Sequence, residues 1–184
     1  IMKIGVRGSN LALAYANRVC NELPCDTEIV VIKTAGDLNP DVPIHEIGGK
    51  GVFCSAIEVA LHNKEIDVAV HSLKPIRGNI DTRLKKLDNA EYDAIILAEA
   101  GLKALDIRRT WMRIPTIPAV GQGVIALQTR KDDIEVINIV KKINHAKTFA
   151  QAQVERAFLK GMGGDCHTAL AAHATGSDPI TLRA

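Results

Sequence analysis

Residues 2–9 read MKIGVRGS, a short strand pattern that runs directly into the start of a helix pattern. Ser9 is a suitable N-cap, because its hydroxyl can accept a hydrogen bond from a backbone N–H in the first turn. Pro24 ends the helix pattern, whose apolar side chains recur every four residues: Leu11, Tyr15, Val19 and Leu23. We therefore expect a strand over Met2–Arg7 and an amphipathic helix after it.

The same alternation of strand and helix patterns continues along the chain. Further strands are expected at Glu28–Lys33, Ile66–Val70, Tyr92–Ala98, Gln122–Leu127 and Ile180–Ala184, with Tyr92–Ala98 as a buried strand. Further helices are expected at Val52–His62, Thr82–Leu87 and Asp132–Ile143, and from the capping box Thr148-x-x-Gln151 to Lys160. This alternation predicts an α/β fold with a largely parallel sheet.

The composition narrows the classes of function. A chain of 184 residues that is 47% hydrophobic and 24% charged is expected to fold as one or two globular domains. A net charge of +2 and an aromatic share of 3% argue against a nucleic-acid partner, and no apolar run is long enough to span a membrane.

The cysteines and histidines show no metal-binding or disulfide pattern. Cysteines with neither C-x-x-C spacing nor high density are expected to be reduced thiols in the cytoplasm: Cys20, Cys25, Cys54 and Cys166. The scattered histidines lack the spacing of metal ligands, so no metal is expected: His62, His71, His145, His167 and His173.

Glycines and basic residues gather where the expected strands give way to helices, as in Arg7-Gly8-Ser9 and Gly48-Gly49-Lys50-Gly51. Helix N-termini attract anions, and ligands of open α/β sheets bind outside the carboxyl ends of the strands. The guanidiniums of Arg77 and Arg83 are suited to carboxylates. A small polyanionic ligand is therefore predicted in one cleft, lined by Arg7, Ser9, Lys50, His71, Ser72 and Lys74.

Each of these features also has a purely structural interpretation. The GGKG segment is often only a turn, and Arg77 and Arg83 also fit a solvated helix face. His71 fits a hydrogen-bonding residue at a strand end. Cys166 fits a small buried hydrophobe, although it follows a glycine turn where a thiol can be exposed and reactive. Composition and spacing alone predict an α/β protein that binds a small polyanion.

A set of motifs resembles the porphobilinogen deaminase family, in the family's order and over nearly the whole chain. They are Gly5–Ala14, Lys33–Asp37, Ile47–Phe53, Glu65–Lys74, Arg77–Leu84, Tyr92–Ala98, Ala100–Lys103, Pro118–Gly123, and Glu155–Leu159 leading to Gly163–Cys166.

The resemblance implies a three-domain architecture, with two lobes like those of periplasmic binding proteins, a cleft between them, and a smaller α/β C-terminal domain. Domain 1 would comprise residues 1–74 and 119–131, domain 2 an incomplete 75–118, and domain 3 an apparently truncated 132–184. It also implies a transferase that joins four porphobilinogen molecules, with loss of ammonia, into hydroxymethylbilane. A cytoplasmic monomer without nucleic-acid or membrane partners is expected.

The resemblance further implies a dipyrromethane primer held covalently by Cys166. Every pyrrole brings an acetate and a propionate, so the growing chain accumulates carboxylates. The residues expected to bind them and the cofactor are Arg7, Ser9, Lys50, Ser72, Lys74, Arg77 and Arg83.

The sequence departs from the family pattern after Lys74. The family places an aspartate there, expected to steady a cationic intermediate, whereas this chain has Pro75, so the catalytic acid is not identified. The family's paired arginines are also absent, Ala104 replaces a common arginine, and Asp165 is inserted before the cysteine. We expect residues to be missing between Lys74 and Pro75. A shortened inactive relative is the alternative, but such a deletion would leave apolar faces of domain 2 unburied.

Two other classes of protein remain as alternatives. A binding protein of the same two-lobed fold would hold a small anion without catalysis, and would have no use for a covalent primer on Cys166. The effector domain of a transcription regulator would need a helix-turn-helix segment, and the sequence has none.

Overall fold

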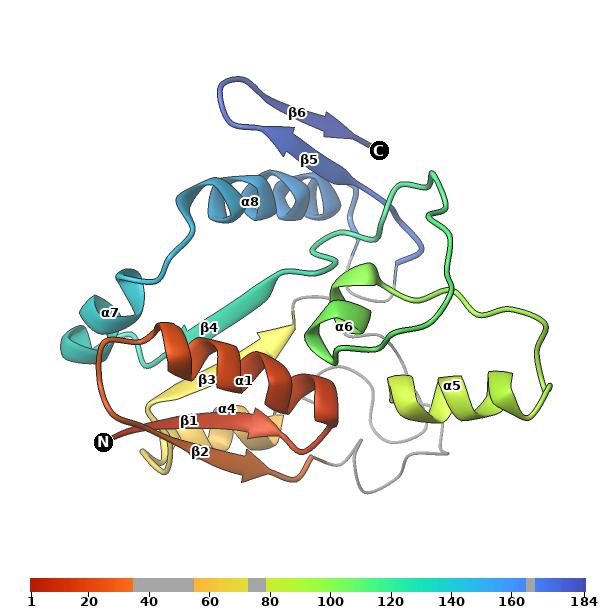
Figure 1. Ribbon diagram of the computed structural model, residues 1–184. Coiled ribbons are helices and arrows are strands. Elements are labelled where there is room, and N and C mark those ends of the chain that lie inside the picture. The colour runs from red at the N-terminus through yellow and green to blue at the C-terminus, as the bar shows by residue number, and fades with distance from the viewer. Residues whose placement is uncertain (35–54, 73–78, 165–167) are drawn as a thin grey trace.

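The computed structural model describes residues 1–34, 55–72, 79–164 and 168–184. A four-stranded sheet forms its centre, in the order β2-β1-β3-β4 (Figure 1). Three strands run parallel, and the last is antiparallel to β3; the strands are β1 (Met2–Arg7), β2 (Thr27–Ile32), β3 (Val68–Ser72) and β4 (Ile125–Thr129). The predicted α/β fold with a largely parallel sheet is confirmed.

Helix α1 (Asn10–Glu22) covers one face of the sheet. As predicted, Ser9 is the N-cap, and its Oγ accepts a hydrogen bond from the N–H of Ala12 at 3.4 Å. The helix ends one residue before Pro24, which cannot continue it, at the C-cap Leu23. The core on this face consists of Met2, Ile4, Val6, Val68 and Val70 from the strands, Ala16, Val19 and Leu23 from or beside α1, and Val136.

Helix α4 (Ser55–His62) packs on the other face, so the sheet lies between two helical layers. Its buried side chains pack against Ile66, which precedes β3, and against Ala69 of β3. They are Ile57, Ala60 and Leu61. Gly5 lies directly under Ile66, and a Cβ at position 5 would collide with the Ile66 side chain. The helix was expected from Val52, but residues 52–54 lie outside the described part of the chain.

Between β3 and β4 the chain leaves the sheet and forms α5 (Ile80–Asp88) and α6 (Glu99–Ala104). The first confirms the helix expected at Thr82–Leu87. The buried strand expected at Tyr92–Ala98 is wrong, because this segment has no strand structure and Ile96 is 70% exposed. A strand needs a neighbour for its backbone N–H and C=O groups, and none of the strands described here pairs with it.

The C-terminal part consists of α7 (Ile134–Lys141), α8 (Ala146–Gly161) and the antiparallel hairpin β5 (His173–Gly176) and β6 (Ile180–Arg183), which lies against α8 (Figure 1). The expected capping box is wrong. Thr148 lies inside the first turn, and the N-cap is His145, whose Nδ1 accepts from the N–H of Thr148 at 3.2 Å. Gln151 instead donates to the carbonyl of Gly176 at 2.7 Å.

Two strand boundaries differ from the expectation by a few residues. β4 begins at Ile125 rather than Gln122, because Gly121 and Gly123 have φ of 73° and 81° and form a turn first. β3 extends to Ser72, so His71 and Ser72 are its last residues.

Candidate functional site

The sheet brings several predicted site residues to one edge. Arg7 ends β1 and Ser72 ends β3, and these parallel strands finish at the same edge of the sheet (Figure 1). β4 enters the sheet at this edge, where Ile125 pairs with Ser72. Ser9 follows Arg7 at the N-terminus of α1. Arg7, Ser9, His71 and Ser72 therefore lie at one carboxyl edge of the sheet, while their convergence on a ligand cleft stays a prediction.

A hydrogen bond joins this edge to α5. The side-chain Nδ2 of Asn10, the first residue of α1, donates to Oδ2 of Asp81 at 2.7 Å. Behind this bond, α5 and α6 pack onto α1, since a Cβ on Gly101 would lie 2.8 Å from Ile80 and 3.8 Å from Leu11. Helix α5 thus approaches the carboxyl edge at its N-terminal turn.

Arg83 lies on α5, two residues beyond Asp81. Its Nη2 donates to the carbonyl oxygen of Ile96 at 3.0 Å, which holds the segment after α5 against the helix. A guanidinium has five N–H donors in a planar fork, and this contact uses one of its three nitrogens. Arg83 is half-buried rather than part of a fully solvated face.

His71 makes a defined contact across the sheet. Its Nε2 lies 2.9 Å from Oε1 of Gln128 on β4. Burial lowers the pKa of His71, and the hydrogen bond to Gln128 and the charge of Glu58 only partly offset this. The imidazole is therefore neutral at pH 7 and donates to the amide oxygen. This geometry supports the hydrogen-bonding interpretation of His71.

The other predicted residues, Lys50, Lys74, Arg77 and Cys166, lie outside the described part of the chain. The same holds for Pro75, so the expected break after Lys74 stays a prediction.

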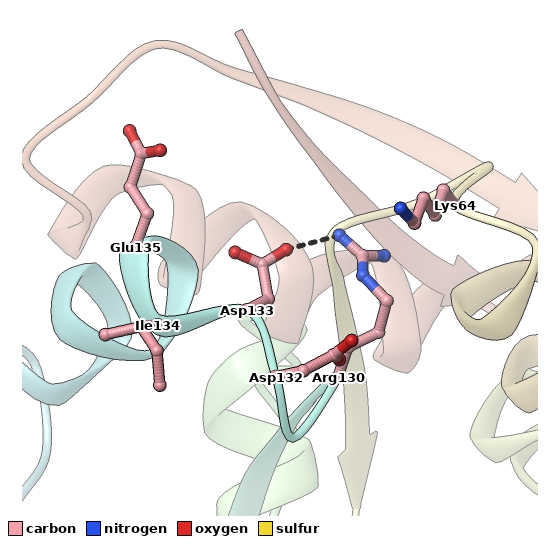
Figure 2. A pocket seen from close by; sticks show the side chains of 6 residues that line it. All are labelled: Lys64, Arg130, Asp132, Asp133, Ile134 and Glu135. Atoms are coloured by element: carbon pink, nitrogen blue, oxygen red, sulfur yellow. Dashed lines mark hydrogen bonds and ion pairs between the residues drawn. The ribbon is translucent and has the colours of Figure 1, made fainter.

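A pocket of about 330 Å³ lies at the opposite, amino-terminal end of β3, away from these residues (Figure 2). It is lined by Lys64, Arg130, Asp132, Asp133, Ile134 and Glu135.

At the centre of this pocket, the guanidinium of Arg130 donates to four oxygen atoms of the protein. Nη1 of Arg130 donates to the carbonyls of Leu61 and Ile66, and Nη2 donates to Asp67 at 3.2 Å and Asp133 at 2.6 Å. Burial alone would lower the pKa of Arg130, but its bonds to Asp133 and Asp67 together raise it. Arg130 joins β4, α4 and α7, and the lining carries two basic and three acidic side chains, so this pocket is not a candidate for an anionic ligand.

The described residues contain neither a membrane-spanning helix nor a metal-binding cluster. None of their helices has the length and apolarity needed to cross a membrane. Among them, no group of three or more His, Cys, Asp or Glu side chains is placed to hold a metal ion.

Several contacts of the site are not foreseeable from the sequence alone. Asn10 and Asp81 each belong to a recognisable motif, but nothing in either motif pairs them. Gln128 was not singled out as the partner of His71. Both pairs join residues more than 50 positions apart, and such pairs depend on the completed fold.

Comparisons with known proteins identify the relatives of this chain. The family model "Porphobilinogen deaminase, dipyromethane cofactor binding domain" matches residues 2–76 and 73–138. The porphobilinogen deaminase of Rickettsia prowazekii is 33% identical over 255 aligned positions, covering 99% of this chain and 85% of the relative. Those of Ehrlichia canis and Lysinibacillus sphaericus are each 34% identical over 253 positions, covering 98% and 97% of this chain and 85% and 82% of the relatives.

An α/β fold with these relatives defines an enzyme of tetrapyrrole biosynthesis, a transferase with a dipyrromethane cofactor. The chain belongs to the porphobilinogen deaminase family.

The alignments also bear on the predicted break. The match to the Rickettsia prowazekii protein has 255 positions, more than the 184 residues of this chain, so the relative has internal residues without a counterpart here. The two pieces of the family match meet at residues 73–76.

Proposed function

We propose that this chain joins porphobilinogen units into hydroxymethylbilane on a dipyrromethane held by Cys166. The observation that carries the proposal is the match of residues 2–138 to the cofactor-binding domain of the family. When bound, the dipyrromethane supplies the primer to which the porphobilinogen units are added.

The described residues suit the carboxylates of such a ligand. Arg7 and Ser9 lie at the carboxyl edge, beside the N-terminus of α1, where the helix dipole favours an anion. Arg83 approaches from α5. We propose that they bind and orient the acetate and propionate groups of cofactor and substrate together with Lys50, Ser72, Lys74 and Arg77.

The domain division is part of the proposal. Residues 1–74 and 119–131 form domain 1, residues 75–118 part of domain 2, and residues 132–184 domain 3, with the site in a cleft between two lobes like those of periplasmic binding proteins. In support, β4 returns to the sheet of β1–β3 after the excursion through α5 and α6. We further propose a cytoplasmic monomer.

One observation favours a second candidate, a binding protein that holds the anionic ligand without turnover. Pro75 follows Lys74, where the resemblance places an acidic residue, and a proline side chain cannot stabilise a cation. If this candidate is right, turnover requires the additional residues that the relatives have, placed between positions 74 and 75.

The intact mass of the purified protein, before and after incubation with porphobilinogen, tests the proposal. A covalent increment in the wild type and none in Cys166→Ser is expected. An increment that persists in Cys166→Ser would remove the cysteine assignment. No increment in the wild type would favour the binding protein, which has no use for a covalent primer.

The charge assignment is tested in the same assay. Arg83→Ala is expected to weaken ligand binding by roughly 1.5–3 kcal/mol, the value of a hydrogen bond to a charged group, with little effect on folding. Arg77→Ala is expected to behave likewise. Unchanged attachment and turnover in both would place these guanidiniums on a solvated face.

A further inference from the structure

Glu155 is a buried carboxylate in the middle of α8, with 6% of the residue exposed. Its Oε2 accepts a hydrogen bond from the backbone N–H of Gly121 at 2.8 Å. Its Oε1 accepts from the backbone N–H of Ala174 at 2.8 Å, and Nδ1 of His173 lies 3.4 Å from the same oxygen. A buried charge is costly unless it is hydrogen-bonded, and here both oxygens have partners.

These partners come from separate parts of the chain. Gly121 lies in the turn that leads into β4 at the carboxyl edge, and Ala174 lies in β5. The two segments also touch directly, because Ala119 pairs with Ala171 and the N–H of Ala172 donates to the carbonyl of Pro118 at 3.1 Å. Glu155 therefore joins α8, the hairpin and the Gly121 turn.

Two of the joined segments, α8 and the hairpin, flank the proposed cofactor cysteine in the sequence. Residues 165–167 follow α8, and the described chain resumes at Thr168, a few residues before the pairing of Ala171. One oxygen of Glu155 thus holds the strand that follows the cysteine, while the other holds the turn that enters the sheet.

We propose that Glu155 is a positioning residue for cofactor attachment, because its carboxylate fixes β5 and the turn at Gly121 relative to α8. This inference rests on the proposed function, since it assigns Glu155 a part in cofactor attachment. The carboxylate acts through backbone N–H groups and does not itself contact the ligand.

The first test compares Glu155→Gln with a matched control on the same helix. The amide of glutamine has one acceptor oxygen, so Glu155→Gln loses one of the two N–H contacts. Gln151→Ala also removes a bond between α8 and the hairpin, that to Gly176, but leaves the Gly121 turn untouched. Amide hydrogen exchange should be about tenfold faster at Gly121 or Ala174 in Glu155→Gln, and unchanged there in Gln151→Ala.

The second test measures the rate at which the apo-protein gains covalent mass on incubation with porphobilinogen. It is made at a temperature where circular dichroism shows each variant folded. Attachment should be about tenfold slower in Glu155→Gln and close to the wild-type rate in Gln151→Ala. A purely structural role would lower the denaturation midpoint of both variants without slowing attachment in the folded protein.

The outcomes separate the two proposals. If the wild type gains no mass, the proposed function fails, while the exchange data still report on the contacts of Glu155 with Gly121 and Ala174. If the wild type gains mass and Glu155→Gln does so equally fast, the positioning role is overturned. Should Glu155→Gln fail to fold, Glu155→Asp keeps the charge on a side chain one methylene shorter, and a wild-type rate in that variant would also overturn the proposal.

Discussion

The sheet and the segment at residues 89–118 have similarly apolar sequences but different structures. In and beside the sheet, Ile4, Ile57 and Ile66 are fully buried between the helical layers. The segment instead exposes its large apolar side chains, and Met112 is 83% exposed. The others are Tyr92, Ile96, Trp111 and Ile114.

Ion pairs connect the exposed parts of this segment, while its helix α6 packs against α1. Nη1 and Nη2 of Arg109 donate to the two carboxylate oxygens of Asp88, and Arg113 donates to the carboxylate of Glu99 at 2.9 and 3.1 Å. The bonds from Arg113 and Lys103 lower the pKa of Glu99 to about 2. Such exposed pairs contribute little to stability. The contrast teaches that an apolar run becomes a strand only where the fold supplies a neighbouring strand.

The largest expected contrast is between two isoleucines. Ile4→Ala should lower the free energy of unfolding by roughly 4 kcal/mol, because it leaves a cavity in a closed core. Ile96→Ala should change it by less than about 0.5 kcal/mol, since the side chain is mostly in water. Chemical denaturation of both variants checks this. A comparable loss in Ile96→Ala would show that the segment is packed.

The next contrast is between two arginines. Arg130→Met should cost about 2–3 kcal/mol, below the value for a fully buried pair because Asp67 and Asp133 are partly exposed. Arg109→Met should cost much less than Arg130→Met, because exposed pairs contribute little to stability. The same denaturation measurement with added salt is informative, because salt should weaken only the Arg109 contribution. Equal losses would contradict the distinction between the two regions.

The smallest expected effect is the pH dependence due to His71. Its pKa in the folded protein lies below the ordinary value of 6.5, so the unfolded chain binds the proton more readily. Stability from the neutral imidazole is present above pH 6.5 and is lost as pH falls toward the lower folded pKa. His71→Gln should flatten the stability curve in this range, as measured by denaturation midpoints. An unchanged slope would mean that other groups control it.

The sequence predicts well the elements whose signals are local. Ser9 caps α1 and Pro24 limits it as expected, because both effects operate within one helical turn. The edge that gathers Arg7 and Ser72 follows from the parallel sheet. The prediction of a strand at Tyr92–Ala98 is wrong because a strand needs a neighbouring strand, and the segment's own sequence does not encode one.

The helix cap at His145 was missed for a different reason. Its imidazole nitrogen occupies the place of the usual hydroxyl or carboxylate acceptor, and Thr148, at the third position of the helix, carries the more familiar signal. The contacts of Asn10, Gln128 and Glu155 escape prediction because each joins segments distant in sequence.

The late return of β4 has a consequence for synthesis. β3 ends at Ser72, but the strand that covers its free side begins only at Ile125. While the ribosome makes the intervening residues, β3 remains an open edge with unpaired backbone groups, the kind of surface on which chains aggregate. Completion of the sheet also requires closing a long loop, which slows folding. The nascent chain therefore spends its most vulnerable interval between translation of Ser72 and of Thr129.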